Sequence, residues 1–499
     1  MFVLGRRDVA AHRARGHVLI WLIWLTGLMA GCTTVPTAPV PTPLPAPVQA
    51  ALDRAGLPAD SLGFVLQPLD GSRPALTRRA QDAMAPASTM KLLTTVVALD
   101  QLGLQHRGRT ELLAGALPRE GRIDGPLILR GGGDPDLDWP ALWWLLRQLR
   151  EQGVREIAGG LVVDRTRFNP ARLDLGAPVF DESPEQPYNV IPDALNFNGS
   201  LLELQLTDTP QGLQAGSLPA LDGLQIDASA LSGQPTRADL PCRSWDDALL
   251  PSRVDADGER LTVRLQGAFL RGCAVRGALN LVDRQWLTTH ALRQLWWELG
   301  GRIGPGDVEA PTPAGAVVLA THEGRPLAEL THRVLKLSDN ALTRLIYLQL
   351  GAQAARPGEA TRAAAERATR DWLSARGLDT TGLVLDNGSG LSRSERITPA
   401  LLAALLKTAH AGPQAPELLA SLPIAGADGT LARRLQDSPA AGRARLKTGL
   451  LRDAVALAGY VPDASGRVWV FVAMLNHPAA ATQGRPVLDA LLNWLAAQP

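Results

Sequence analysis

The sequence predicts an α/β protein in which one domain is interrupted by a β-rich insertion. With 499 residues the chain is too long for one ordinary core, so two or three domains are expected. Residues 50–105 and 296–499 mix helix-length apolar patterns with strand patterns. Residues 106–295 are mostly short strand-like pieces separated by Gly, Pro and Asp. The two outer segments are therefore predicted to form one domain, and residues 106–295 to form inserted β-rich material of one module or two.

The first residues are predicted to precede the fold. Arginines lead into the thirteen-residue apolar stretch "VLIWLIWLTGLMA", which is too short for a comfortable membrane span and is typical of a signal peptide. The ending "LMAGC" resembles a lipobox, so residues 1–32 are interpreted as a lipoprotein-type signal peptide with lipidation at Cys32. Cleavage by an ordinary signal peptidase near Ala30 is the alternative. Residues 33–49 are rich in proline and predict an extended linker.

The elements of the outer segments are predicted in chain order. A helix, a strand at 63–70, a turn and a returning strand precede a helix that starts at Ser88. Within the insertion one helix is predicted, near 139–153. Further helices are predicted at 286–300, 327–351, 360–377 and 398–412, followed by an antiparallel hairpin and a last helix near Pro486.

Cysteines and charge exclude several function classes. Besides Cys32 the chain has Cys242 and Cys273, an even pair that predicts a disulfide in an exported protein, with two buried free thiols as the alternative. No Cys/His cluster has zinc spacing, so neither a metal nor another cofactor is predicted. The net charge of +1 and the absence of a basic stripe argue against nucleic acid as a partner.

Lysine is rare in this chain. Of 50 Lys and Arg residues only four are lysine, and lysine, unlike arginine, can be made neutral by burial. Three of the four lie in or beside short motifs: Ser88-x-x-Lys91, Lys336 before Ser338-Asp339-Asn340, and Lys447-Thr448-Gly449. Taken singly, each motif has an ordinary explanation: Ser88 and Ser338-Asp339 as helix caps, and Lys447-Thr448-Gly449 as the start of a strand. The joint occurrence of the three motifs in this order favours a catalytic function for these residues.

The residue types predict a role for each group. Ser88 is the predicted nucleophile and Lys91, one turn along the helix, its base, with burial and Lys447 lowering the pKa of Lys91. Ser338 and Asn340 are predicted in a loop between helices, where Ser338 relays a proton and Asn340 holds the substrate amide.

The third motif is predicted to lie on an edge strand. There Lys447, Thr448 and Gly449 would pair with an extended substrate, Lys447 would supply positive charge, and the N–H groups of Ser88 and residue 450 would form the oxyanion hole.

The motifs are those of serine β-lactamases and penicillin-binding proteins, and nearly all of the chain after the linker resembles the class C, low-molecular-mass D-alanyl-D-alanine carboxypeptidase/endopeptidase family. The resemblance is carried by "PASTMKLLTTVVALDQLG", "LILRGGGDPDL", "LKLSDNALTRLIYLQLG", "DNGSGLSR" and "RLKTGLLRDAVALAGYV". It implies a transpeptidase/β-lactamase-like domain, an antiparallel sheet flanked by helices, with a second domain inserted after the nucleophile helix and a third nested within it.

Leu450 departs from the family pattern. The family usually has Thr or Ser after Lys-Thr-Gly, and that hydroxyl helps to bind the terminal carboxylate of the substrate. Leu450 therefore predicts a preference for cross-link cleavage over carboxypeptidase action, or weak activity. Asp386, Asn387 and Ser389 are further candidates for the site wall. The "GGGDPD" residues Gly132, Gly133, Asp134 and Asp136 are interpreted as turn residues, and Lys336 has no assigned role.

The resemblance implies a serine-type DD-peptidase that cleaves D-alanyl bonds of peptidoglycan stem peptides through an acyl-enzyme and is acylated by β-lactams. The alternatives are a β-lactamase or esterase on the same scaffold, and a non-catalytic or weakly active wall-associated protein. The expected location is the cell envelope, through a lipid anchor and with the outer membrane favoured.

Overall fold

The computed structural model of the protein describes residues 43–236, 241–258 and 260–499. The predicted signal peptide, Cys32 and most of the predicted linker lie outside these residues. Helix α1 (Ala46–Ala55) begins inside the segment predicted as linker, so the extended interpretation is wrong for the last linker residues. Pro47 stands in the first turn of this helix, where its missing N–H is tolerated. Within the described ranges, no helix has the length and apolar character needed to span a membrane.

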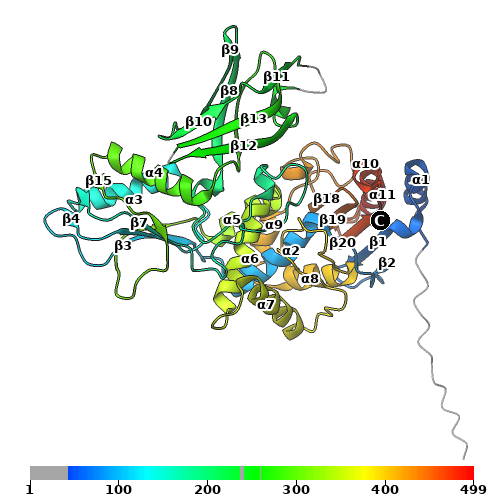
Figure 1. The fold of residues 1–499 in the computed structure, drawn as a ribbon. Coiled ribbons are helices and arrows are strands. Elements are labelled where there is room, and N and C mark those ends of the chain that lie inside the picture. Colours follow the sequence, from blue (N-terminus) through cyan, green and yellow to red (C-terminus); the bar gives the residue numbers. More distant parts are fainter. Residues whose placement is uncertain (1–42, 237–240, 259) are drawn as a thin grey trace, which may run out of the picture. The chain divides into compact units, whose positions relative to one another are not determined.

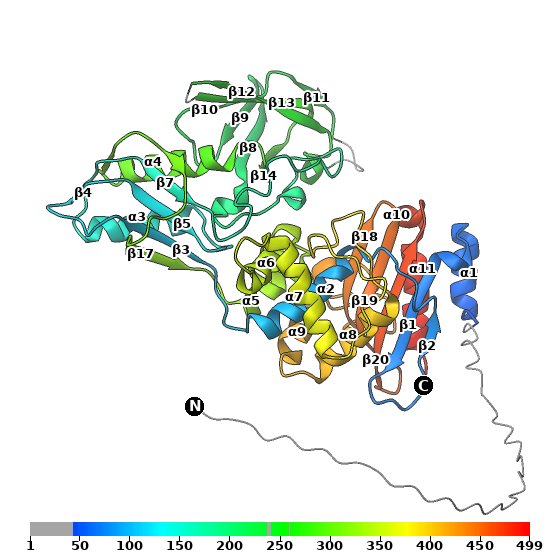
Figure 2. The same ribbon diagram turned by 60° about the horizontal axis from the view of Figure 1, so that its bottom comes forward.

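An antiparallel sheet of five strands joins the two outer segments (Figures 1 and 2). Its order is β18 (Arg445–Leu451), β19 (Ala454–Pro462), β20 (Val468–Asn476), β1 (Leu62–Pro68) and β2 (Leu76–Arg78). The early strand β1 pairs along its whole length with the late strand β20. The predicted single α/β domain, interrupted by an insertion, is therefore what the chain forms.

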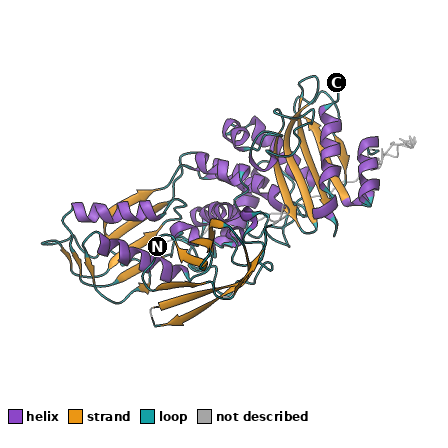
Figure 3. Cartoon of the chain, turned by 90° about the horizontal axis from the view of Figure 1, so that it is seen from above, coloured by secondary structure: helices purple, strands orange, loops and turns teal. Residues whose placement is uncertain are grey.

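Both faces of this sheet are covered by helices, as the view in Figure 3 shows. In β20, Phe471 and Ala473 pack into the cluster with α1 and α11 (Arg485–Ala496), whereas Val470 and Val472 pack into the cluster with α2 (Met90–Gln101) and α8 (Pro399–Ala411). A strand buried on both faces is apolar throughout, which explains the unbroken run "VWVFVAML". The other helices of this part are α5 (Leu327–Lys336), α6 (Asn340–Ala354), α7 (Thr361–Ala375), α9 (Ala415–Ser421) and α10 (Ala480–Gln483).

The insertion contains its own five-stranded sheet. The order is β16 (Val308–Glu309), β7 (Leu161–Asp164), β5 (Leu127–Gly131), β3 (Arg109–Ala114) and β17 (Val317–Glu323), with a small sheet of β15 (Arg302–Ile303), β6 (Glu156–Ile157) and β4 (Arg122–Ile123) beside it. Helices α3 (Trp139–Glu151) and α4 (Arg284–Glu298) pack in its core. Because β15, β16 and β17 pair with insertion strands, the predicted boundary at residue 295 is too early, and the insertion returns to the outer domain only after β17.

A further set of strands lies in the chain between β7 and α4. One sheet contains β14 (Ala274–Leu279), β8 (Leu202–Thr209) and β9 (Gly212–Ser217); the other contains β10 (Leu224–Asp227), β11 (Leu231–Gln234), β12 (Leu249–Asp257) and β13 (Arg260–Leu270). Because β7 and α4 both belong to the insertion, the strands between them in the chain form a module nested inside it. A disulfide joins Cys242 to Cys273, between the short helix η5 (Cys242–Ser244) and the turn before β14.

Candidate active site

Ser88 lies in the single-turn helix η2 (Ala87–Thr89) that leads into α2. Its hydroxyl caps no helix; instead it accepts a hydrogen bond from Lys91 Nζ at 3.1 Å. Ala87 has a φ of +46°, which an alanine rarely adopts, so the turn is held from outside. Two glycines press on it: a Cβ on Gly390 would lie 1.9 Å from Ala87 O, and one on Gly449 would lie 2.7 Å from Pro86 O. The nucleophile turn is thus wedged between the loop at 390 and strand β18.

Lys91 is fully buried and has an acceptor for each of its three N–H bonds. Besides Ser88, its Nζ donates to Asn340 Oδ1 at 2.6 Å and to Ser389 O at 2.5 Å. Burial lowers the pKa of Lys91 to about 7; the carboxylates of Glu395 and Asp339 oppose this shift, and the Arg344 guanidinium adds to it. Near neutral pH both protonation states of Lys91 are therefore populated, which suits a general base.

Ser338 and Asn340 lie at the break between α5 and α6, as the motif spacing predicts, so the single helix predicted over 327–351 is wrong and the segment forms two helices. Ser338 has a φ of +62°, and Asn340 is the first residue of α6. The cap of α6 is Asp339, whose carboxylate accepts from the N–H of Leu342 at 2.9 Å. The capping interpretation is thus correct for Asp339, which leaves Ser338 and Asn340 to face the two lysines. The second amide atom of Asn340, Nδ2, donates to Tyr188 O at 3.2 Å.

Lys447, Thr448, Gly449 and Leu450 lie on β18, the first strand in the sheet order and therefore an edge strand, as predicted. Lys447 Nζ donates to Ser338 Oγ at 2.9 Å and to Thr448 O at 2.7 Å. Burial, reinforced by the charge of Lys91, holds the pKa of Lys447 well below its usual range. From the sequence, Lys447 is expected to lower the pKa of Lys91; in the structure the Arg344 guanidinium is the cation that lowers it, and Lys91 in turn lowers the pKa of Lys447. The Thr448 hydroxyl donates to Thr430 Oγ1, and Leu450 is 46% exposed.

The remaining sequence candidates divide into two groups. Ser389 reaches the site through its carbonyl, whereas Asn387 holds its own loop by donating to Leu391 O and Asp386 pairs with Arg362. Lys336 is structural, since it pairs with Asp428 and ties the end of α5 to the 422–428 loop.

The "GGGDPD" loop lies at the junction of the insertion and α6. Gln349 Nε2 donates to the carbonyls of Gly132 and Gly133, and Asp134 accepts from Thr110 and contacts His322 Nδ1 at 2.6 Å. These residues are therefore turn and junction residues, held by Gln349, Thr110 and His322.

Two features of the site were not predicted. The carboxylate of Glu395 is completely buried behind Ser389 and Gly390. The insertion also supplies a wall, because Tyr188 contacts Asn340, Arg344 donates to the carbonyls of Asn189 and Val190, and Arg452 pairs with Glu182 at 2.8 Å. A Gly-Ser-Gly turn presents several N–H groups to one side and needs an acceptor. The sequence could therefore have pointed to Glu395 as the acceptor for this turn. No local sequence pattern reveals the wall that the insertion supplies.

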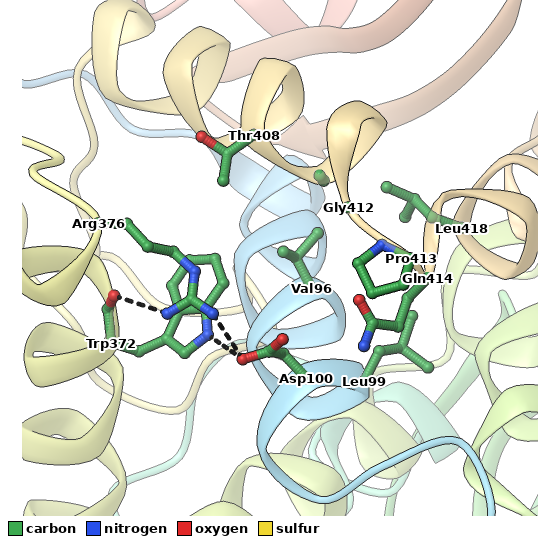
Figure 4. A pocket seen from close by; sticks show the side chains of 11 residues that line it. Val96, Leu99, Asp100, Trp372, Arg376, Thr408, Gly412, Pro413, Gln414 and Leu418 are labelled. Carbon is green, nitrogen blue, oxygen red and sulfur yellow. Dashed lines mark hydrogen bonds and ion pairs between the residues drawn. The ribbon is translucent and has the colours of Figure 1, made fainter.

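A pocket at the opposite end of α2 is separate from this site (Figure 4). There Asp100 accepts from Trp372 Nε1 at 2.7 Å and from Arg376 Nη2 at 2.8 Å, and the Arg376 guanidinium stacks 4.0 Å from the Trp372 ring centre. The polar groups satisfy one another, so this cluster is structural. Over the described residues, no group of three or more His, Cys, Asp and Glu side chains is arranged to hold a metal ion.

Comparison with known proteins places this geometry in a family. Residues 44–498 match the model of the D-Ala-D-Ala carboxypeptidase 3 (S13) family. A D-alanyl-D-alanine carboxypeptidase of Actinomadura sp. is 30% identical over 471 residues, covering 90% of this chain and 84% of that protein. The D-alanyl-D-alanine carboxypeptidase DacB of Haemophilus influenzae is 28% identical over 425 residues, covering 83% and 85%. The crystal structure of penicillin binding protein 4 from that organism matches with a TM-score of 0.74 at 24% identity, covering 90% of this chain and 99% of that one. The chain belongs to the D-Ala-D-Ala carboxypeptidase S13 family.

Proposed function

We propose that the protein is a serine DD-peptidase that cleaves D-alanyl bonds of peptidoglycan stem peptides through an acyl-enzyme. The observation that carries the proposal is the contact of the Ser88 hydroxyl with Lys91, a buried amine whose pKa lies near 7. A lysine of this kind accepts the serine proton at neutral pH, which makes the hydroxyl a nucleophile.

The reaction follows from the contacts. Neutral Lys91 takes the proton of Ser88 as Oγ attacks the D-alanyl carbonyl, and the N–H groups of Ser88 and Leu450 receive the oxyanion. The peptide C–N bond then breaks as the leaving amine takes, through the Ser338 hydroxyl, the proton that Lys91 removed from Ser88. Water later hydrolyses the ester, and a proton of that water returns to Ser88 Oγ. Two hydrogen bonds orient Asn340 to hold the substrate amide: its Oδ1 accepts from Lys91 Nζ, and its Nδ2 donates to Tyr188 O.

The first experiment measures the intact mass of the protein after mixing with a penicillin, with Ser88→Ala as the control. A persistent adduct on the wild type alone supports Ser88 as nucleophile and a peptidase. Rapid conversion of the penicillin without an adduct would identify a β-lactamase. Neither an adduct nor consumption of penicillin would contradict the proposal and favour a non-catalytic wall protein. Release of D-alanine from a pentapeptide then tests the peptidase activity directly.

We further propose that the enzyme prefers cross-linked peptides over free pentapeptides. Leu450 presents an exposed apolar side chain directly after Lys447-Thr448-Gly449, where no hydroxyl is offered to a terminal carboxylate. The neighbouring Thr448 hydroxyl is already bonded to Thr430. Leu450→Thr should therefore raise kcat/KM on a pentapeptide and leave cleavage of a cross-linked dimer nearly unchanged. An unchanged pentapeptide rate would contradict this preference.

The protein is also proposed to act in the cell envelope, held by a lipid on Cys32. Support comes from the family, whose substrate is the cell wall, and from the lipobox-like "LMAGC". Metabolic labelling with a fatty acid should mark the wild type but not Cys32→Ala, and fractionation should find it with the outer membrane. A mature N-terminus next to Ala30 would refute the anchor.

A further inference from the structure

Glu395 is a buried charged group to which the reaction above gives no task. Its side chain is fully enclosed in the loop before α8. Oε1 accepts the N–H groups of Asp386 at 3.2 Å, Asn387 at 3.0 Å and Gly388 at 2.7 Å, and Oε2 accepts that of Gly390 at 2.8 Å. Four backbone donors thus converge on one carboxylate.

These four bonds fold residues 386–390 into the turn that supports the catalytic pair. From this turn Ser389 O accepts from Lys91 Nζ at 2.5 Å, and Gly388 O accepts from Thr94 Oγ1 at 2.6 Å, so two carbonyls are aimed at α2. The same turn sets Gly390 against Ala87, with no room for a side chain between them. Since Lys91 and the nucleophile turn both rest on this loop, the position of the catalytic amine depends on what holds the loop together.

The surroundings of Glu395 suit an anion. All four of its hydrogen-bond partners are donors, so a proton on the carboxyl group would find no acceptor among them. Burial raises the pKa of Glu395 and the neighbouring Asp386 carboxylate adds to that rise, whereas the backbone N–H bonds act against it. The nearby cations are Lys91 and Arg344, and in both the charge of Glu395 raises the pKa that burial lowers.

We propose that Glu395 is a positioning residue that holds Lys91 in place through the Ser389 carbonyl and balances the charge of its ammonium form. It acts through Lys91 and touches no substrate. The inference deepens the proposed function, and only its activity readout rests on that function.

The charge effect has a definite sign. The other charged or titratable groups that act on Lys91 are Asp339 before α6, Arg344 on α6 and Lys447 on β18, and all remain when Glu395 is replaced. In Glu395→Gln, burial and Arg344 are opposed by Asp339 alone, so the pKa of Lys91 should fall, by about one unit for the loss of a close opposite charge. In Glu395→Asp the charge stays but the carboxylate is one methylene shorter, so the turn moves while the pKa of Lys91 changes little.

The test titrates Lys91 directly in the full-length protein. With four lysines in the chain, lysine-selective 13C labelling yields four side-chain signals, and Lys91→Arg identifies the one to follow by NMR. The matched control is Asp463→Asn, which removes another fully buried, multiply bonded carboxylate, in the turn between β19 and β20. A lower midpoint for Lys91 in Glu395→Gln, with no change in Asp463→Asn, supports the proposal. An unchanged midpoint in Glu395→Gln overturns it.

Penicillin acylation supplies the second readout. The acylation rate of Glu395→Gln should fall at its plateau while its acid limb moves to lower pH; a purely structural role would lower the rate without moving the limb. If Glu395→Gln does not fold, Glu395→Asp decides through the NMR signal of Lys91, whose ammonium donates to the Ser389 carbonyl. A changed side-chain chemical shift of Lys91 together with a retained midpoint supports the proposal, and wild-type values for both overturn it. A wild type that penicillin fails to acylate would refute the proposed function, whereas the NMR titration would still decide the role of Glu395.

Discussion

At the scale of single residues, the site depends on keeping one amine close to neutrality without leaving it unpaired. Lys91 has three acceptors for its ammonium form, yet complete burial lowers its pKa to about 7. Lysine is needed here because arginine stays charged under any of these conditions.

A pH dependence follows from this balance. Protonated Lys91 cannot accept the Ser88 proton, so the rate of penicillin acylation should be low in acid, rise through about pH 7 and reach a plateau above it. Stopped-flow measurement of the acylation rate between pH 5 and 9 gives this rising acid limb of the pH profile. Lys91→Arg should acylate about 10²- to 10⁴-fold more slowly and lose the limb. A flat profile for the wild type would assign the base to another group.

Gly390 gives a second prediction at this scale. In Gly390→Ala the new methyl meets Ala87 O, and because that atom is backbone the nucleophile turn must shift. A displacement of about 1 Å costs on the order of 10²-fold in rate, so acylation should fall by about that factor. Gly442→Ala is the matched control, since Gly442 has a similar φ of +70° but open space around it. An equal loss in both variants would mean that backbone strain, not contact with the turn, is responsible.

At the scale of elements, the α5–α6 turn shows how one short segment serves packing and chemistry together. Asp339 caps α6 while Ser338 and Asn340, on either side, face Lys447 and Lys91. The motif spacing predicted this loop correctly because two residues that are two apart would diverge on a regular helix. The edge position of β18 was likewise predictable from its role in the motif set.

The cap of α6 can be tested separately from its charge. Asp339→Ala loses the bond to the Leu342 N–H, so the free energy of unfolding should fall by about 1 kcal/mol. Asp339→Asn retains a good cap and should lose less stability, while the removed charge lowers the pKa of Lys91 in both. Urea unfolding and the acylation profile measure the two effects. Equal destabilisation of the two variants would show that the Arg333–Asp339 ion pair, and not the cap, matters.

At the scale of the whole molecule, strand pairings between segments far apart in the sequence were harder to predict than the motifs. That the outer segments form one domain could be inferred because both mix strands and helices, whereas neither the pairing of β1 with β20 nor the return of β17 to β3 could. Strand pairing between distant segments leaves no local signal, which is why the boundary at residue 295 was placed too early. The wall supplied by Tyr188 escaped sequence analysis for the same physical reason, since it depends on segments that meet only in the folded chain. Glu395 differs, because it binds backbone N–H groups only five to nine residues away and could have been found from the Gly-Ser-Gly turn.

The disulfide provides a test at this scale. Cys242 and Cys273 are 31 residues apart in the nested module, far in the chain from every motif. Closing a loop of that size stabilises a fold by about 3.7 kcal/mol through the unfolded chain. Replacing both with serine should therefore destabilise the module without slowing acylation of Ser88, because the motif residues are held by α2, α6 and β18. Calorimetry and penicillin acylation on the same sample separate the two effects. A matched loss of acylation in the folded variant would mean instead that the nested module supports the catalytic geometry through the wall at Tyr188.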